Sequence, residues 1–392
     1  MLENLDQQPP DALLALIKLF HADPRPDKID LGVGVYRTAD GATPVFASIK
    51  AAEATLVAEQ DSKAYLGPEG DMGFVHALMP HVFAGEDATR DGRIEGMQTP
   101  GGTGAVRLAV ALAKRAGVAR IHMGTPSWPN HAQILADTGV EMVGFAHARN
   151  DGTADMDALR EALRSAGKTD AVLLHGCCHN PTGVDYTDAE WDEISTLLTE
   201  TGVLPIIDLA YQGLGRGMDE DAYGARAVID AVPEALIAYS CDKNFGLYRD
   251  RVGALYAVGG DAGQTAVTMS NGAALARANW SMPPDHGASA VRLVLSDPAK
   301  TREWRDELAS MRSRIADVRA KLAASGNAGK VDLAPLGLQF GMFAMLPLDK
   351  EQIQRLRDEH GIYMAGSGRI NVAGLTMGNI DKFVSALASV SG

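Results

Sequence analysis

Cysteine and basic residues are both scarce in this sequence of 392 residues. Its three cysteines, Cys177, Cys178 and Cys241, are odd in number and lack C-x-x-C spacing, which argues against a disulfide framework and a zinc site. A formal charge of -14 excludes the basic footprint that nucleic-acid binding requires. No apolar run reaches the roughly 18 residues of a membrane span, and the acidic N-terminus is unlike a secretory signal. We expect a cytoplasmic protein that binds no metal, nucleic acid or membrane.

The length of the chain is about twice that of a usual domain, which indicates a large domain with a smaller partner. Residues 93–260 alternate between short apolar runs and amphipathic helices, as in a mostly parallel sheet flanked by helices. The predicted fold class is therefore α/β. We expect an N-terminal arm over 1–12, a large domain over 45–300, and a small α+β domain built from 13–44 and 301–392.

Helix signals mark several boundaries in this pattern. Thr187 and Glu190 have the spacing of a capping box, which opens a helix that Gly202 closes. A second helix is predicted over 103–115, and apolar residues three or four apart predict a long helix over 304–322 that connects the domains. Beyond it, the sequence predicts a strand over 339–346, a helix over 349–359 and a strand-turn region over 362–374.

Four buried strands of the predicted sheet are each followed by polar or aromatic residues. The strands cover 119–123, 171–174, 203–207 and 236–239. The segments that follow them are 124–131, 175–183, 208–211 and 240–243. Open α/β sheets bind ligands in the crevice outside the carboxyl ends of their strands, so we expect these segments to converge on one site.

A glycine-rich turn, Gly101-Gly102-Thr103-Gly104, precedes a predicted helix. Free backbone N–H groups and the helix dipole favour an anion such as phosphate at that position. The dinucleotide pattern G-x-G-x-x-G is not met, because Arg107 stands where its third glycine is needed. A strand-to-helix turn without any ligand fits the same residues equally well.

Lys243 and Asp208 each follow a buried strand, where an ionised side chain is costly. The lysine is explained either by a desolvated amine that forms a Schiff base or by a charge that reaches solvent. An unpaired buried carboxylate costs several kcal/mol, so Asp208 is expected to have a fixed cationic partner. A protonated pyridine nitrogen is such a partner.

Six segments together carry a resemblance to a known family. They are Gly101-Gly102-Thr103-Gly104, Pro126-Ser127-Trp128-Pro129-Asn130-His131, His175-Gly176-Cys177-Cys178-His179-Asn180-Pro181-Thr182-Gly183, Asp208-Leu209-Ala210-Tyr211-Gln212-Gly213, Lys243-Asn244-Phe245-Gly246-Leu247-Tyr248 and Ser367-Gly368-Arg369-Ile370-Asn371. In this order and nearly from end to end, the chain resembles the aspartate and aromatic amino-acid aminotransferases. These are class I members of the fold-type I enzymes that use pyridoxal 5′-phosphate, so the resemblance implies that cofactor.

The resemblance implies three catalytic residues: Lys243, Asp208 and Tyr211. Lys243 would form the Schiff base with the cofactor and then carry a proton between the substrate Cα and the cofactor. Asp208 would keep the pyridine nitrogen protonated, so that the ring accepts electrons. Tyr211 and Asn180 would hydrogen-bond the phenolic oxygen of the ring, and Trp128 would stack on its face.

Cofactor phosphate binding is implied for one group of residues: Gly102, Thr103, Ser240 and Arg251. Tyr65 resembles a tyrosine that reaches the phosphate bound by the other subunit. The resemblance therefore implies a homodimer with shared active sites.

The implied substrate contacts include Arg369, whose planar guanidinium matches an α-carboxylate. Gly34 resembles a backbone contact on a segment that closes over the substrate, and Trp128 and Asn180 also face it. Arg277 matches an arginine that crosses from the partner subunit to bind a distal carboxylate. Aromatic substrates then require Arg277 to swing away, because leaving it buried and unpaired against a ring is costly.

Two residues depart from the family pattern. Two histidines are open to two interpretations. Asp242 stands where the family has serine, which places a carboxylate near the phosphate and beside Lys243 for no reason evident in the sequence. Met282 stands where aspartate enzymes usually have asparagine, which favours broader acceptance of side chains. His131 and His175 are either partners that orient Asp208 or simply buried, hydrogen-bonded histidines.

The predicted activity is a ping-pong transamination between aromatic amino acids, aspartate or both, and 2-oxoglutarate. One alternative is a decarboxylase or β-lyase on the same scaffold, which shares every cofactor contact. Another is a non-catalytic, aminotransferase-like binding protein. The acidic charge argues against that last alternative, as do the roughly ten residues before the first apolar helix, which are too few for a DNA-binding module.

Overall fold

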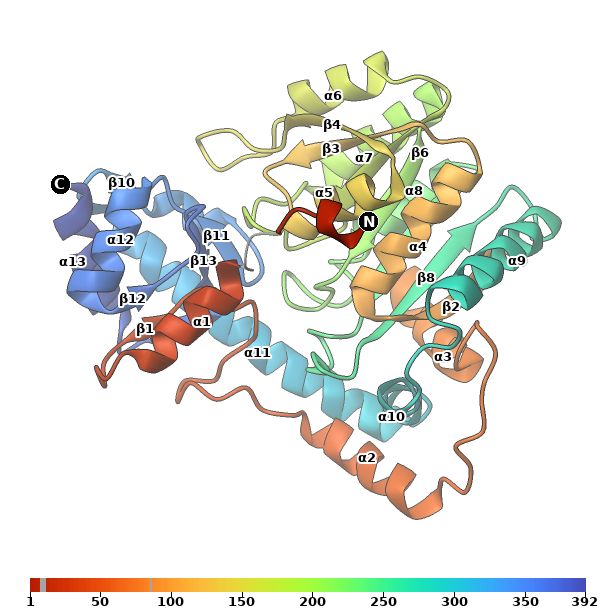
Figure 1. Cartoon of the computed structure of the whole chain (residues 1–392), viewed down its shortest axis with the longest axis horizontal. Coiled ribbons are helices and arrows are strands. Elements are labelled where there is room, and N and C mark those ends of the chain that lie inside the picture. Colours follow the sequence, from red (N-terminus) through yellow and green to blue (C-terminus); the bar gives the residue numbers. More distant parts are fainter. Residues whose placement is uncertain (8–11, 85–86) are drawn as a thin grey trace.

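The computed structural model describes residues 1–7, 12–84 and 87–392 (Figure 1). A seven-stranded sheet forms the centre of the larger part, in the order β2-β8-β7-β6-β5-β3-β4. Its strands are β2 (Ile94–Pro100), β3 (Arg120–Thr125), β4 (Glu141–Ala146), β5 (Asp170–His175), β6 (Leu204–Leu209), β7 (Ala235–Ser240) and β8 (Val252–Val258). Strands β3 to β7 run parallel, and β8 is antiparallel to both β2 and β7. The predicted α/β fold with a mostly parallel sheet is confirmed.

Helices cover both faces of this sheet because its strands are apolar on both sides. Along β5, Val172 and Leu174 join one buried cluster, while Ala171 and Leu173 join another on the opposite face. The helices of the larger part are α2 (Ala47–Glu59), α3 (Met72–Phe83), α4 (Gly101–Arg115), α5 (Pro129–Thr138), α6 (Met156–Ser165), α7 (Asp188–Thr201), α8 (Tyr223–Ala231), α9 (Ala262–Asn279) and α10 (His286–Leu295). In the part of the chain that the structure describes, no helix has the length and apolar character to cross a membrane.

A smaller unit packs beside the sheet, at the left of Figure 1. Short strand pairs hold it together: β1 is parallel to β12, and β11 and β10 are antiparallel to β13 and β9. Its elements are α1 (Ala12–Ala22), β1 (Ile29–Asp30), β9 (Asn327–Ala328), β10 (Val331–Asp332), β11 (Phe343–Met345), α12 (Lys350–His360), β12 (Ile362–Tyr363), β13 (Arg369–Asn371) and α13 (Ile380–Ser391). Among the described residues there are also three 3-10 helices, η1 (Leu2–Asn4), η2 (Ala334–Leu338) and η3 (Val372–Gly374).

One long helix, α11 (Pro298–Ala324), joins the two parts (Figure 1). Its first half contributes Trp304 and Leu308 to the buried cluster of the larger part. Its second half contributes Val318 and Leu322 to the cluster of the smaller unit. The domain limits given above stay a prediction, and residues 8–11 of the predicted arm lie outside the described residues.

Most of the predicted elements are confirmed, with one clear error. The capping box of Thr187 and Glu190 is present, and Gly202 ends α7 in the left-handed conformation. The predicted strand over 339–346 is wrong in extent, because only Phe343–Met345 pair with another strand. Gly341 has a φ of +72°, and the N–H of Phe340 bonds the carbonyl of Gly183 instead of a neighbouring strand.

Trp304 provides a test of how this core supports the loop after β7. Its ring stacks on Phe245 with centroids 4.3 Å apart, and its Nε1 donates to the Asn244 carbonyl at 2.7 Å. Trp304→Ala should lower stability by about 3–5 kcal/mol, because it removes a fully buried ring from a packed core. Trp304→Phe keeps the stack and should cost roughly 1 kcal/mol for the lost hydrogen bond. Urea unfolding measures both, and equal losses would contradict the packing argument.

Candidate active site

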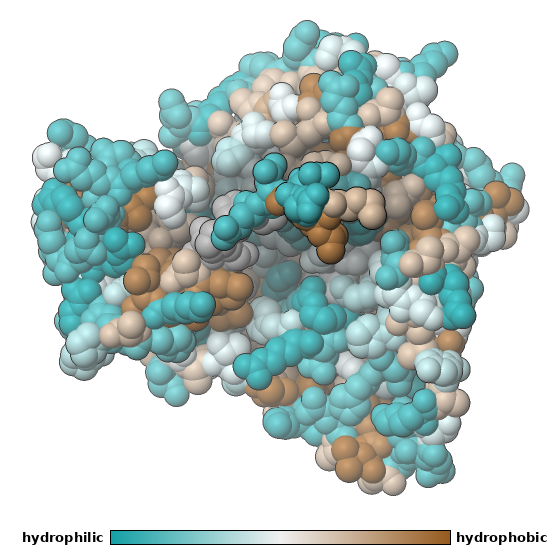
Figure 2. All heavy atoms as spheres, in the orientation of Figure 1, coloured by the Kyte–Doolittle hydropathy of each residue, from teal (hydrophilic) through white to brown (hydrophobic). Residues whose placement is uncertain are grey.

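The carboxyl ends of the parallel strands converge on one cavity of about 330 Å³. The strand register aligns His175 with Asp208, and Asp208 with Ala238, so the ends of β5, β6 and β7 are level. Figure 2 shows the molecular surface hollowed at its centre, between the smaller unit and the sheet. The cavity is lined by most of the predicted site residues: Gly34, Gly102, Thr103, Trp128, Asn180, Asp208, Tyr211, Lys243, Arg251 and Arg369.

Three predicted site residues do not line this cavity. Ser240 is fully buried beneath the first turn of α4, where its Oγ accepts the N–H of Asp242 at 3.2 Å. Tyr65 is 94% exposed. Arg277 lies in the last turn of α9 and donates from Nη1 to the hydroxyl of Ser281. The roles given to these three residues stay predictions.

Asp208 is held by a chain of hydrogen bonds that spans three strand ends. Nε2 of His131 bonds Oδ2 of Asp208 at 3.0 Å, and Nδ1 of His131 bonds Oγ of Ser127 at 3.0 Å. The same Oγ bonds Nε2 of His175 at 3.0 Å, so His175 reaches Asp208 only indirectly. Burial pushes the pKa of Asp208 upward, but the His131 hydrogen bond and nearby cationic charge outweigh it and hold the pKa below its ordinary value. Asp208 therefore stays ionised.

Burial lowers the pKa of both His175 and Lys243, whereas it pushes the pKa of Asp208 upward. It lowers the pKa of His175 to about 3, with His131 adding to the effect, so His175 is neutral. Burial also lowers the pKa of Lys243, although the carboxylates of Asp242 and Asp208 counteract it. Nζ of Lys243 lies 5.1 Å from the centre of the Tyr211 ring. The amine is therefore easier to deprotonate than a surface lysine, as a nucleophile requires.

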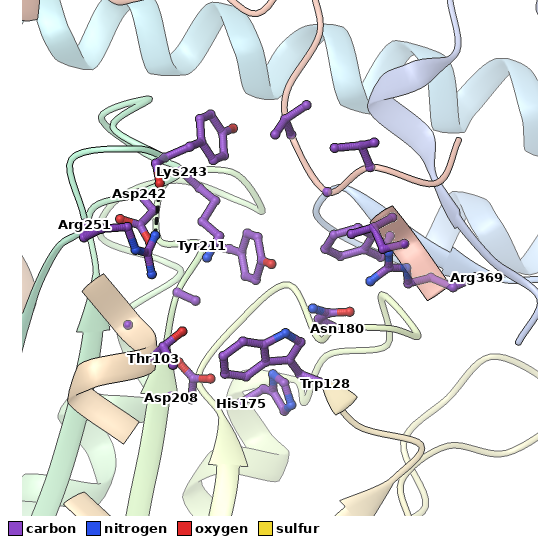
Figure 3. A pocket seen from close by; sticks show the side chains of 18 residues that line it. Thr103, Trp128, His175, Asn180, Asp208, Tyr211, Asp242, Lys243, Arg251 and Arg369 are labelled. Carbon is purple, nitrogen blue, oxygen red and sulfur yellow. Dashed lines mark hydrogen bonds and ion pairs between the residues drawn. The ribbon is translucent and has the colours of Figure 1, made fainter. Parts of the chain in front are cut away.

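The far end of the cavity presents Arg369 and Asn180 (Figure 3). Nη2 of Arg369 donates to the carbonyl of Gly32 at 2.8 Å, and its guanidinium lies 4.7 Å from the centre of the Phe343 ring. Within the described residues, Nε of Arg369 and Oδ1 of Asn180 are buried without a hydrogen-bond partner. Unpaired buried polar atoms of this kind fit a ligand that supplies both an anionic group and a donor.

The opposite end of the cavity is suited to a phosphate. Helix α4 begins at Gly101, with a φ of +68°, and no side chain caps its first turn. Arg251 lies against this turn and pairs with Asp242, as Figure 3 shows. Backbone donors at a helix start together with a guanidinium form an anion site. The cavity thus fits an elongated cofactor that has a phosphate at one end and lies beside Lys243 and Asp208.

Three residues that line the cavity or bond its neighbours were not given roles from the sequence. Ser127 belongs to a quoted motif, but its bridging position depends on His131 of the same motif and on His175 from another segment. Tyr248 lines the cavity and accepts the N–H of Tyr36 at its hydroxyl, at 3.0 Å. Phe343 packs edge-on against Tyr211 with ring centres 5.9 Å apart. No sequence signal distinguishes Phe343 from other apolar strand residues.

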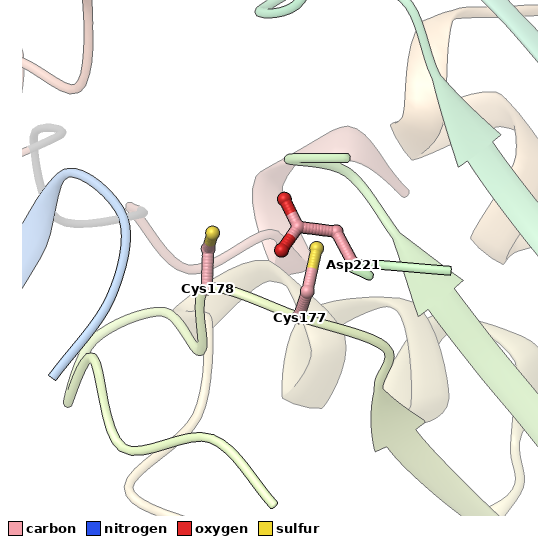
Figure 4. A group of neighbouring side chains, drawn as sticks. All are labelled: Cys177, Cys178 and Asp221. Carbon is pink, nitrogen blue, oxygen red and sulfur yellow. The ribbon is translucent and has the colours of Figure 1, made fainter. Parts of the chain in front are cut away.

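Two adjacent thiols, which closely follow β5, lie beside a carboxylate (Figure 4). The ligand atoms of Cys177, Cys178 and Asp221 lie within 4.8 Å of one another. Asp221 already accepts three backbone N–H groups from residues 213–216. Burial raises the pKa of Cys177, and it raises that of Cys178 to about 12. Protonated thiols and an engaged carboxylate indicate a packing role for this cluster.

Comparison with known proteins bears directly on this geometry. The model of the family "Aminotransferase class I and II" matches residues 26–387. The chain is 49% identical to a tyrosine aminotransferase of Rhizobium meliloti (strain 1021), over 96% of each protein. It is 43% identical to an aspartate aminotransferase of Escherichia coli (strain K12), over 100% of each. An aromatic-amino-acid aminotransferase from Burkholderia pseudomallei, solved covalently bound to pyridoxal phosphate, matches 100% of both chains with a TM-score of 0.95 at 32% identity.

These matches decide between the readings of the sequence. The relatives cover the whole chain and are named as aminotransferases, which speaks against the decarboxylase, β-lyase and binding-protein alternatives. The resemblance inferred from six segments is confirmed over nearly the full length. The chain belongs to the class I and II aminotransferase family.

Proposed function

We propose that this chain is a pyridoxal-phosphate-dependent transaminase that exchanges amino groups between aromatic amino acids, aspartate or both, and 2-oxoglutarate in a ping-pong cycle. One observation carries the proposal: a single cavity holds a desolvated lysine, an ionised Asp208 fixed by His131, and an arginine at each end. Relatives named tyrosine, aspartate and aromatic-amino-acid aminotransferase support the substrate classes. A cytoplasmic location and the lack of a nucleic-acid partner stay predictions from the sequence.

The charged, apolar and neutral residues of the cavity have different tasks. When bound, pyridoxal 5′-phosphate supplies an aldehyde that condenses with amines and a ring that accepts electrons. Asp208 offers a fixed negative charge to a cationic ring nitrogen, and Trp128 offers a flat apolar face. Nζ of Lys243 serves first as a nucleophile and then holds and returns a proton, because burial lowers its pKa. Tyr211, whose pKa burial raises, remains a neutral hydrogen-bond donor.

Substrate orientation follows from Arg369 and Asn180. The guanidinium of Arg369 is fixed by the carbonyl of Gly32 and the ring of Phe343, so it can bind an α-carboxylate with little further ordering. The unpaired oxygen of Asn180 accepts a donor beside it. Gly34 lies against Phe343, where an added Cβ would come within 2.9 Å of the ring, so its segment closes tightly over this end.

A second subunit completes the proposed site. Tyr65 and Arg277 lie outside their own subunit's cavity, on segments that meet where the N–H of Leu66 contacts Sδ of Met282 at 3.0 Å. Two residues expected to cross to a partner therefore belong to one region of the surface. This arrangement supports a homodimer in which each cavity receives Tyr65 and Arg277 from the partner.

Removal of the lysine amine tests the proposed cofactor chemistry. Lys243→Ala should abolish covalent attachment of pyridoxal 5′-phosphate and transamination, because Lys243 is the one lysine among the described residues that line the cavity. The wild type should turn yellow with the cofactor, and borohydride reduction followed by peptide mass analysis should mark Lys243. Lys168→Ala, at an exposed lysine, should leave both properties unchanged. A colourless wild type that takes up no cofactor would overturn the proposal.

Two arginine variants test the substrate assignment. Arg277→Ala should lower kcat/KM for aspartate by roughly tenfold to a hundredfold and leave phenylalanine nearly unaffected, since only aspartate has a distal carboxylate. Arg369→Ala should impair both donors, because both carry an α-carboxylate. The measurement is steady-state kinetics with 2-oxoglutarate as acceptor. Equal losses for aspartate and phenylalanine in Arg277→Ala would count against its role.

Mixing inactive variants tests whether the sites are shared. Hybrid dimers of Lys243→Ala and Arg277→Ala should recover about a quarter of wild-type aspartate activity, because half of the dimers are mixed and each has one intact site. Hybrids of Lys243→Ala and Arg369→Ala should recover nothing, because these two residues line the same cavity of one chain. Recovery is measured after the mixture is exchanged in mild denaturant. The absence of recovery in the first mixture would place Arg277 in its own subunit's site.

A further inference from the structure

Asp242 is a buried carboxylate at the phosphate end of the cavity. It is 3% exposed and lines the cavity next to Lys243. Its Oδ1 accepts the N–H of Val252 at 3.2 Å, and its Oδ2 accepts Nη1 of Arg251. Both oxygens are thus held by the start of β8, and the carboxylate faces into the site instead of away from it.

The guanidinium of Arg251 contacts this carboxylate and also lies against the start of α4 (Figure 3). Nη1 is fully used, since it donates to Asp242 and to the carbonyl of Tyr248 at 3.0 Å. Nη2 lies 2.6 Å from the point where a Cβ on Gly101 would stand. The uncapped N–H groups of α4 open on the same space. One edge of the guanidinium therefore binds an internal carboxylate, and the other edge is available to an anion.

We propose that Asp242 is a positioning residue that links cofactor binding to proton uptake. As a carboxylate it orients Arg251 in the free protein, and the carboxyl binds one proton from solvent when the phosphate of the cofactor enters. A phosphate monoester carries about -1.5 to -2 charges at pH 7, and a carboxylate that shares its guanidinium repels it. A protonated carboxyl removes that repulsion and adds a donor. The inference rests on the proposed function and concerns how the same site binds its cofactor.

The charges around Asp242 give the direction of the pH dependence. The titratable groups of the cavity and its edge are Cys241, Lys243, Tyr248 and Arg251 on its own segment, His175 from β5, Asp208 and Tyr211 from β6 and the loop after it, and Arg369 from β13. Burial raises the pKa of Asp242 in the free protein, and Lys243 and Arg251 oppose this. Bound phosphate adds negative charge and draws on Arg251, so it raises this pKa further. Phosphate affinity is then highest below the free-state pKa and falls as the pH rises through the window between the two values.

Calorimetric titration of the full chain, freed of cofactor, with inorganic phosphate measures the linkage. Pairs of buffers with different ionisation enthalpies at several pH values give the number of protons taken up. The wild type should take up as much as about one proton more per phosphate than Asp242→Asn, and its affinity should fall by up to about tenfold per pH unit relative to that variant. Asp250→Asn removes the same charge from the same loop outside the cavity and should behave as wild type.

Equal proton counts in the wild type and Asp242→Asn would overturn the proposal, whichever protein binds phosphate more tightly. Asp242→Ser replaces the amide variant if circular dichroism shows that the latter does not fold, and the same comparison then applies. Added pyridoxal 5′-phosphate separates this result from the proposed function. Yellow wild-type protein with equal proton counts overturns the linkage alone, whereas colourless wild-type protein overturns the proposed function.

Discussion

The hydrogen bond between His131 and Asp208 is the interaction on which the rest of the site depends. Burial alone would raise the pKa of Asp208 and so disfavour the negative charge that balances a cation in the cavity. An ionised carboxylate only accepts, so Nε2 of His131 donates to it, and Nδ1 of the same ring bonds Oγ of Ser127. Neutral His175 in turn fixes Ser127. The negative charge of Asp208, near the end of β6, is therefore maintained by residues that follow β3 and by the last residue of β5.

The one antiparallel strand between β2 and β7 determines where the phosphate end of the cavity lies. Because β8 runs against its neighbours, its first residue pairs with Pro100 of β2, and Gly253 pairs with Ser240 of β7. Arg251 directly precedes this strand and so meets the start of α4. A parallel β8 would place its amino end at the opposite edge of the sheet. Arg251 and Gly101 are far apart in the chain, and the register of β8 with its neighbours, not the local sequence, brings them together.

The sequence predicted features that have a local physical cost. A lysine and a carboxylate at the ends of apolar strands need a reason, and Lys243 and Asp208 do face one cavity. The layered fold followed from the periodicity of apolar residues. Residues whose position depends on distant segments were harder to predict. Ser240 lies beneath α4, where Gly102 packs closely on its Cβ, and its expected contact with the phosphate stays a prediction. Phe343 has no local signal, and the roles proposed for Tyr65 and Arg277 require a second chain.

The two arginines of the cavity differ in what a ligand must displace. The guanidinium of Arg369 contacts the carbonyl of Gly32 and the ring of Phe343, its Nε has no partner among the described residues, and burial lowers its pKa. An arriving carboxylate would therefore meet a desolvated charge. Arg251 already has an internal carboxylate, which a phosphate must share or neutralise. A carboxylate of the protein therefore competes with an anion at Arg251, whereas Arg369 contacts a carbonyl and a ring. This asymmetry makes anion binding at Arg251 sensitive to the charge of one side chain, that of Asp242.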